Sequence, residues 1–399
     1  MLPIPSLNKI NLKLLMDSVK YKGGIVTGGE CKIGCKYCYL RQSNKMTPYI
    51  PWNIPLISKN DFKKAVLTIK KYKYETVTLG DGVDLISSEP FIHPLIYDFI
   101  EELETTPLIR NIDITTSGLC IEKEKYAFLR HCKKITWRIS CSSLSKEGRR
   151  KVVSVEDPTK LLDFLYFLHE ETPCSASMIQ LVIYSLEFFI KDREIIKNNF
   201  PKFLRRIYIR ELGYSKFFSE KAKSIIQHCH GTFNEVLKYC VKNNISINWD
   251  DSSLNENFEL KCKFDCFKAR VNEFIKYINA ALVHCVIKKF NAPLLCIPES
   301  CFFILPKVRN EIILPEMKKR YLKIKNITFG GNYKSYGLLT LGDFSHALEN
   351  VRLKDYDAIV LNGIFLNQDQ RDLRREHISN FKNKINIPVI VMNHFGVFE

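Results

Sequence analysis

Short apolar runs alternate with longer amphipathic stretches from about residue 24 to residue 213. Six of the runs are rich in β-branched residues and bounded by polar or glycine positions, as strands are. Such alternation is typical of βα units around a parallel sheet. Six units predict an α/β fold with a partial (βα)6 TIM-like barrel, short of the eight units of a complete one. The expected strands are residues 24–27, 76–79, 111–115, 134–140, 178–183 and 206–210.

Helical patterns lie between these runs, near residues 59–71, 94–104, 124–130, 159–169 and 187–199. Beyond residue 213 the sequence becomes mainly helical, with stretches around 219–241 and 267–290. From residue 297 it is richer in proline and short strands. We therefore expect a core barrel over residues 1–213, a helical, cysteine-containing linker region over 214–296 and a smaller α/β C-terminal domain over 297–399.

The chain is basic, with 60 Lys and Arg against 43 Asp and Glu and a formal net charge of +17. Such a charge suits a polyanionic partner such as nucleic acid. However, the excess is mostly lysine spread along the chain, and no arginine-rich arm or recognised nucleic-acid module accompanies it. A nucleic-acid partner therefore stays open but is not favoured.

The N-terminal residues lack the continuous apolar core of a secretory signal. No later run reaches the ~18 apolar residues of a membrane span. We expect a cytoplasmic protein without a membrane partner. In that reducing compartment, its 14 cysteines are more typical of thiols or metal ligands than of disulfides.

Cys31, Cys35 and Cys38 directly follow the first expected strand. In parallel α/β sheets the loops at the carboxyl ends of the strands form the ligand face. Three cysteines with CxxxCxxC spacing can ligate three irons of a [4Fe–4S] cluster, which normally takes four thiolates, so one iron is left open. A zinc site is the alternative, but it would need a fourth nearby ligand. The first fifty residues contain no further cysteine and no histidine.

The triplet, with Tyr37 at the aromatic position, resembles the CxxxCxΦC motif of the radical S-adenosylmethionine (SAM) superfamily. The resemblance implies that the open iron chelates the amino and carboxylate groups of SAM. It further implies that one electron cleaves SAM to a 5′-deoxyadenosyl radical, which abstracts hydrogen from a substrate that the sequence does not identify. The electron would come from reduced flavodoxin or ferredoxin.

In the family, a Gly-Gly-Glu-Pro-like segment after the second strand contacts the SAM amino group. Here the segment separates its glycines from Glu-Pro, so the candidates are Gly80, Asp81, Ser88 and Glu89, with an ordinary turn as the alternative. After the third strand, Thr116 and Ser117 are similar to the family's Thr-Asn-Gly-like turn, although their hydroxyls could equally cap a helix.

Alternation along the fourth strand places Arg138, Ser140 and Ser142 on one face, where family members often contact SAM. The fork of Arg138 would suit the SAM carboxylate. Gln180 and Arg210, on the next two strands, are weaker candidates of the same kind. Each of them could equally be a polar residue at the rim.

Cys141 and a group of five C-terminal cysteines are further candidates. Cys141, at the end of the fourth strand, could donate a hydrogen atom to a substrate radical, with a buried thiol as the alternative. Four thiolates would be enough for a second iron–sulfur cluster. The pair Cys262 and Cys266 has the i, i+4 spacing of one helix face. Buried core cysteines are the alternative for this C-terminal group, which comprises Cys262, Cys266, Cys285, Cys296 and Cys301.

The residues 328–340, together with Asp343 and residues 357–363, resemble a segment of an uncharacterised C-terminal domain fused to some bacterial radical SAM proteins. Gly330 and Gly331 would allow a tight turn there. This resemblance implies a domain architecture but no activity.

Three functions remain open. The first is a radical SAM enzyme acting on a small metabolite or a peptide. The second is a nucleic-acid-directed lyase or modifying enzyme, because residues 35–40 also resemble the cluster loop of DNA-repair lyases that split a thymine dimer, an echo that Asp84 and residues 115–117 loosely extend. The third is an iron–sulfur electron carrier or sensor, which would not need the polar face of the fourth strand. Methyl transfer through cobalamin is disfavoured, because the Asp-x-His-x-x-Gly signature is absent.

Overall fold

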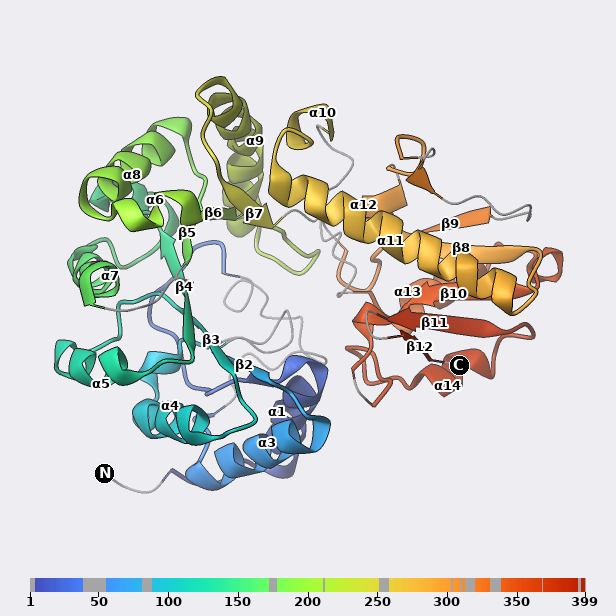
Figure 1. Cartoon of the computed structure of the whole chain (residues 1–399), viewed down its shortest axis with the longest axis horizontal. Helices are drawn as coiled ribbons and strands as arrows, with labels where there is room; N and C mark the ends of the chain where they lie inside the picture. Colours follow the sequence, from blue (N-terminus) through green and yellow to red (C-terminus); the bar gives the residue numbers. More distant parts are fainter. Residues whose placement is uncertain are drawn as a thin grey trace. The chain divides into compact units, whose positions relative to one another are not determined.

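The computed structural model describes residues 4–38, 55–80, 88–171, 178–210, 212–250, 258–302, 304–308, 311–312, 320–330, 339–367, 369–393 and 396–398. The chain divides into two compact units, Met1–Asp250 and Asp251–Glu399 (Figure 1). This boundary differs from the expected divisions at residues 213 and 296. The difference arises because a long helix and a seventh strand continue the first unit beyond residue 213.

The first unit is built on a seven-stranded sheet whose strands follow one another in chain order. Every neighbouring pair is parallel. The expected partial barrel of the TIM type is confirmed, with one strand more than predicted. The strands are β1 (Gly24–Ile25), β2 (Thr76–Leu79), β3 (Asn111–Thr116), β4 (Ile135–Ser142), β5 (Met178–Val182), β6 (Ile207–Arg210) and β7 (Asn248–Asp250).

Helices cover the outer side of this sheet (Figure 1). Ser58 begins one of them, α3, with a capping box: its Oγ accepts from the Asp61 N–H, and the Asp61 carboxylate accepts from the Ser58 N–H. The helices are α1 (Lys9–Lys22), α3 (Lys59–Tyr72), α4 (Ile96–Thr105), α5 (Tyr126–His131), α6 (Lys146–Val152), α7 (Thr159–Glu171), α8 (Leu186–Asn199) and α9 (Glu220–Lys242), with 3-10 turns η1 (Pro90–Ile92), η2 (Lys123–Lys125) and η3 (Pro201–Arg206).

The two faces of the first sheet differ in chemistry. One face carries fully buried apolar side chains such as Ile114, Trp137 and Ile139. The opposite face is polar, because successive strand side chains alternate between faces and the register aligns polar residues on neighbouring strands. We call it the polar face, and its central members are Asn111, Asp113, Thr115, Thr136, Arg138, Ser140 and Gln180.

The second unit contains a five-stranded sheet in the order β12-β11-β10-β8-β9. Only the β11–β12 pair is antiparallel. Its strands are β8 (Pro293–Pro298), β9 (Arg320–Ile324), β10 (Ala358–Asn362), β11 (Val389–Asn393) and β12 (Gly396–Phe398). Its helices are α10 (Phe258–Lys261), α11 (Asp265–Ile287), α12 (Glu299–Phe302), α13 (Leu341–Leu348) and α14 (Ile378–Lys382), with 3-10 turns η6 (Leu353–Asp355) and η7 (Gly363–Phe365).

Asp343, from the C-terminal segment singled out in the sequence, has a structural role in this unit. It forms a capping box with Thr340 at the start of α13. Its carboxylate also accepts from the N–H groups of Ile327 and Thr328, both at 2.9 Å. Gly330 adopts a positive φ of 63°, and Gly331 lies outside the described residues.

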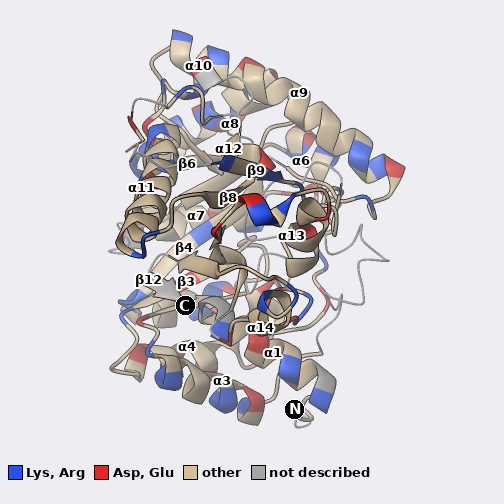
Figure 2. Cartoon of the chain, turned by 90° about the vertical axis from the view of Figure 1, so that its right-hand side faces the viewer, with Lys and Arg blue, Asp and Glu red and all other residues tan. Residues whose placement is uncertain are grey.

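Charged residues are dispersed over both units. In the view of Figure 2, Lys and Arg are spread over many elements and alternate with Asp and Glu. Among the described helices, none is long and apolar enough to span a bilayer.

Candidate cluster and SAM site

The loop that carries the three cysteines follows β1 at the carboxyl edge of the first sheet. Its entry is shaped by Gly29, whose φ of 86° lies in the left-handed region that favours glycine. A Cβ at this position would lie 2.8 Å from the Leu56 side chain. The chain turns again at the cysteines, where the Cys38 N–H donates to the Cys35 carbonyl at 3.2 Å. We call residues 29–38 the cysteine loop.

Backbone hydrogen bonds tie the cysteine loop to the end of α6. The Lys36 N–H donates to the Val152 carbonyl at 2.9 Å. The Gly34 carbonyl accepts from both the N–H and the hydroxyl of Ser154, at 3.1 and 3.0 Å. None of these bonds involves sulfur, so the fold of the chain holds the loop independently of any bound metal.

The three thiols of the loop are partly exposed, and Cys35 lies close enough to Cys38 and Cys31 for their charges to interact. Burial, together with the charges of Cys38 and Cys31, raises the pKa of Cys35 to about 12. Thiols bind metal as thiolates, so binding iron would release their protons. In the described part of the chain, no three Cys, His, Asp or Glu side chains converge on a single metal ion. The thiolates of an iron–sulfur cluster bind separate irons, and the donor set of this loop fits that group.

Tyr37, which stands between Cys35 and Cys38 in the sequence, is buried. Its hydroxyl forms a hydrogen bond of 2.8 Å with the Ser142 hydroxyl. Burial and the neighbouring Cys35 raise the pKa of Tyr37, whereas the Arg210 guanidinium opposes that shift. The structure therefore brings three of the predicted SAM-binding residues, Tyr37, Ser142 and Arg210, to the cysteine loop.

Glu89 forms hydrogen bonds with two other predicted site residues, Thr116 and Ser117. Its buried carboxylate accepts from the Thr116 hydroxyl at 2.5 Å and from the Ser117 N–H at 2.8 Å. Burial raises the pKa of Glu89, and these hydrogen bonds oppose the rise. A buried carboxylate at the carboxyl edge of the sheet suits an ammonium group, because the cation would compensate its charge.

Gly80 and Ser88 lie next to Glu89. The Ser88 N–H donates to the Gly80 carbonyl at 2.7 Å, and the Ser88 hydroxyl is 3.0 Å from that of Thr27. A Cβ on Gly80, whose φ is 83°, would lie 2.8 Å from Pro90 Cδ. Asp81 and Asp84 lie outside the described residues.

Arg138 is already paired on the polar face. Its Nε donates to Asp113 Oδ1 at 2.9 Å and its Nη2 pairs with Oδ2, which is a bidentate arrangement. The edge of the guanidinium that we expected to meet the SAM carboxylate is thus engaged by Asp113. The expected alternation is also interrupted, because the register shifts between Ser140 and Ser142 and removes Ser142 from the face of Arg138 and Ser140.

Two buried polar atoms on the polar face have no protein partner in the described structure. They are Thr115 Oγ1 and Gln180 Oε1. Thr115 lies opposite Arg138 in the β3–β4 register, and Gln180 lies opposite Ser140 in the β4–β5 register. Buried polar atoms are nearly always hydrogen-bonded in folded proteins, so these orphan acceptors indicate where a bound molecule or water completes the face.

Cys141 is fully buried and lies on the same apolar face of β4 as Trp137 and Ile139. Its burial raises the pKa of the thiol. Its role as hydrogen donor stays a prediction.

Cys120, which the sequence analysis did not single out, is partly exposed. Burial and the charges of Glu89 and Cys31 together raise the pKa of Cys120 to about 12. Its position four residues after β3 was the available signal.

Cys262 and Cys266 were expected on one helix face, but the structure does not place them on a common helix. Cys262 lies in the turn between α10 and α11, and α11 begins only at Asp265, so the i, i+4 rule does not apply to Cys262 and Cys266. Cys285 and Cys296 are fully buried, and Cys296 belongs to the core of the second unit. A second cluster stays a prediction.

Residues 25–183 match the sequence model of the Radical SAM superfamily. Among solved structures, the chain is similar to Streptococcus suis SuiB (17% identity, 57% of this chain and 48% of that chain, TM-score 0.40). It is also similar to SuiB bound to S-adenosylmethionine (16%, 57% and 49%, 0.39) and to SuiB bound to the precursor peptide SuiA (18%, 57% and 47%, 0.41). The match spans about half the length of each of these chains.

No match to a curated protein was found. The family match begins within β1, ends just after β5 and includes the cysteine loop, Glu89, Arg138 and Gln180. The chain therefore carries a radical SAM domain over residues 25–183.

Proposed function

We propose that Cys31, Cys35 and Cys38 hold a [4Fe–4S] cluster and that the enzyme uses it to cleave SAM reductively. When bound, the cluster and SAM supply a 5′-deoxyadenosyl radical that abstracts hydrogen from an organic substrate. The observation that carries the proposal is the triplet of thiols with CxxxCxxC spacing on a loop that backbone hydrogen bonds hold in place, inside the radical SAM domain. Reduced flavodoxin or ferredoxin is the proposed electron donor.

The residues around the loop have separable tasks in this proposal. Glu89, held by Thr116 and Ser117, provides a negative charge for the SAM ammonium. Tyr37 closes the loop against Ser142 and excludes water from its inner side. Gln180 and Thr115 offer unsatisfied acceptors to a polar substrate. An electron carrier would have no use for such a face, so the polar face supports the enzyme over the carrier or sensor alternative.

The proposed substrate is a small metabolite or a peptide. On the polar face, the charges of Arg138 and Asp113 compensate each other, which suits a substrate with little net charge at that point. A nucleic-acid substrate is the second candidate, favoured by the net charge of +17. Nucleic-acid binding that weakens steeply with added salt would support this second candidate.

The test is anaerobic reconstitution with iron and sulfide, followed by dithionite and SAM, with 5′-deoxyadenosine quantified. Cys35→Ala should bind less iron and form no 5′-deoxyadenosine. The matched control is Cys132→Ala, because Cys132 is also partly exposed but precedes β4, at the opposite edge of the sheet. This control should behave as wild type.

A wild-type protein with a fully loaded cluster that forms no 5′-deoxyadenosine, with or without candidate substrates, would contradict the proposal and favour the carrier. Equal loss in Cys35→Ala and Cys132→Ala would indicate damage to the fold and not to a cluster ligand. Loss confined to Cys35→Ala supports the proposal.

A further inference from the structure

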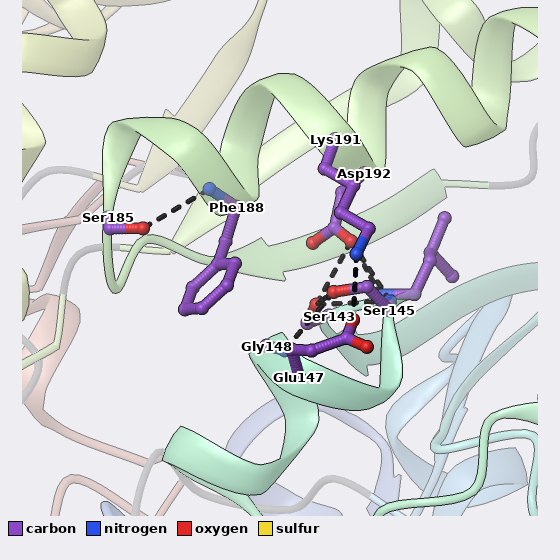
Figure 3. Close-up of polar contacts among 9 residues, drawn as sticks. Ser143, Ser145, Glu147, Gly148, Ser185, Phe188, Lys191 and Asp192 are labelled. Atoms are coloured by element: carbon purple, nitrogen blue, oxygen red, sulfur yellow. Dashed lines mark hydrogen bonds and ion pairs between the residues drawn. The ribbon is translucent and has the colours of Figure 1, made fainter.

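The turn that follows β4 is organised by a buried carboxylate from a distant helix. Asp192 of α8 is 2% exposed, and its Oδ1 accepts three hydrogen bonds (Figure 3). The donors are the Ser143 hydroxyl at 3.0 Å, the Leu144 N–H at 3.0 Å and the Ser145 N–H at 3.1 Å. One side chain of α8 therefore fixes three successive residues of the turn.

A buried cation holds the same turn from the other side. Arg149 of α6 is 1% exposed, and its Nη1 donates to the carbonyls of Cys141 at 2.8 Å and Ser143 at 3.2 Å. Its Nε donates to the Val155 carbonyl at 2.9 Å. The two carbonyls that Nη1 binds belong to the residues immediately before and after Ser142. We call Asp192, Arg149 and residues 141–145 the β4 turn network.

The residue enclosed by this network has a strained backbone. Ser142 has a φ of 61°, in the left-handed region that is costly for a residue other than glycine. It also lies at the register shift that ends the regular pairing of β4 with β5. Such strain persists only where the surroundings impose it, and it concentrates at functional sites. Here the strained conformation directs the Ser142 hydroxyl to Tyr37, in the middle of the cysteine loop.

The network reaches the cysteine loop by a second route. Arg149 lies one turn before the end of α6, and the Val152 carbonyl at that end accepts from the Lys36 N–H. Ser154, just beyond α6, donates twice to the Gly34 carbonyl. The loop is therefore held through its side chain at Tyr37 and through its backbone at Gly34 and Lys36, and both connections start from the β4 turn network.

We infer that Asp192 and Arg149 are positioning residues for the cluster: by holding Ser142 and the end of α6, they fix Tyr37 and the spacing of Cys35 and Cys38, and so tune how the open iron receives SAM. This inference rests on the proposed function. Asp192 acts through Ser142, Tyr37 and the loop backbone, whereas Arg149 acts by the same route and its charge also opposes the rise that burial causes in the pKa of Cys35. Residues that orient metal ligands in this indirect way commonly change affinity or activity by about 10–100-fold when replaced.

The molecule provides a matched control on the same two helices. Glu147 of α6 and Lys191 of α8 form an exposed ion pair at 2.8 Å, next to Asp192 (Figure 3). Glu147→Gln breaks an α6–α8 contact without touching the turn. Exposed ion pairs contribute little to stability, so this variant reports the effect of losing a helix contact alone.

The first measurement uses the cluster-free protein and hydrogen exchange at residues 34–38. Asp192→Ala should speed exchange of the Lys36 amide at least tenfold, because the anchor of the turn is lost, whereas Glu147→Gln should leave it unchanged. Asp192→Asn should restore most of the protection, because its amide oxygen can accept the same hydrogen bonds. Unchanged exchange at Lys36 in Asp192→Ala would overturn the inference whether or not the chain cleaves SAM.

The second measurement uses the reconstituted protein and the electron paramagnetic resonance spectrum of the reduced cluster, with and without SAM. Asp192→Ala should bind iron as wild type does but lose the spectral change on adding SAM, and its KM for SAM should rise about tenfold, with kcat less affected. A wild-type response to SAM in this variant would refute the positioning role.

If Asp192→Ala does not fold, Ser142→Ala removes the hydroxyl contact to Tyr37, and Tyr37→Phe removes that contact together with the hydrogen bond between Tyr37 and Cys35. Both variants should weaken the same spectral response. A normal response in both of these variants would refute the inference. A wild-type protein that forms no 5′-deoxyadenosine would instead contradict the proposed function, because the exchange experiment does not depend on it.

Discussion

The parallel sheet of the first unit and the mainly parallel sheet of the second unit differ in how their faces are covered. Every residue of β8 in the second unit is buried, and β10 is buried except at Asn362. In the first unit, β4 alternates between buried apolar residues and the less buried Thr136, Arg138 and Ser140. Parallel sheets are normally covered on both faces, so the second unit follows the rule and the first departs from it. The less buried polar face of the first sheet is therefore the face that we expect to bind ligands.

This comparison predicts that truncation of the second sheet affects stability most. Leu361 of β10 is fully buried in the core of the second unit. Leu361→Ala should lower the free energy of unfolding of that unit by about 2–5 kcal/mol, through lost apolar burial and the cavity left behind. Urea unfolding followed by circular dichroism measures this. A change below about 1 kcal/mol would show that the second sheet is not a tightly packed scaffold.

A polar substitution in the first unit should instead affect ligand binding. Glu89→Gln keeps the shape of the side chain but removes the negative charge proposed for the SAM ammonium. SAM affinity should fall by about 10–100-fold, which corresponds to a hydrogen bond to a charged group worth about 1.5–3 kcal/mol. Stability should not fall comparably, because burial already disfavours the ionised Glu89, as its raised pKa indicates.

Isothermal titration of SAM into the reconstituted protein measures this effect, with the exposed Glu147→Gln as control. Unchanged affinity in Glu89→Gln would remove Glu89 from the SAM site. Lost stability with unchanged affinity would make Glu89 a structural residue, and the two sheets would then resemble each other more than we propose.

The smallest effect is expected at Thr115. Its buried hydroxyl lacks a protein partner, so Thr115→Val should change the free energy of unfolding by less than about 1 kcal/mol, or raise it slightly. Substrate turnover should fall all the same if the polar face binds substrate. Clear destabilisation in denaturant unfolding would mean that the hydroxyl is satisfied within the folded protein, and the contrast between the sheets would weaken.

Much of the fold of the first unit follows from local sequence. The second strand is predicted residue for residue at Thr76–Leu79, and the fifth within one residue at Met178–Val182. These strands are continuous apolar or alternating runs with clear boundaries. In contrast, β7 was missed because three residues, Asn248–Asp250, carry too little pattern, and α6 because its short segment is dominated by charged residues.

The site was less accessible to sequence reasoning than the fold. Spacing alone located Cys31, Cys35 and Cys38. The pairing of Arg138 with Asp113 depends on the register between two strands 25 residues apart in sequence. The turn that follows the left-handed Ser142 is held by Asp192, 49 residues beyond Ser143. No local pattern encodes such contacts, because they exist only once the helices have packed.

The backbone attachment of the cysteine loop has a consequence for how the protein withstands oxygen. Because Lys36 and Gly34 are held by Val152 and Ser154, loss of the proposed cluster would leave the backbone of its loop in place. Oxidative damage then falls on the thiols, which must be returned to the reduced state before they bind iron again. On the proposed function, repair of an inactivated molecule would therefore require reductant, iron and sulfide, and not refolding of the domain.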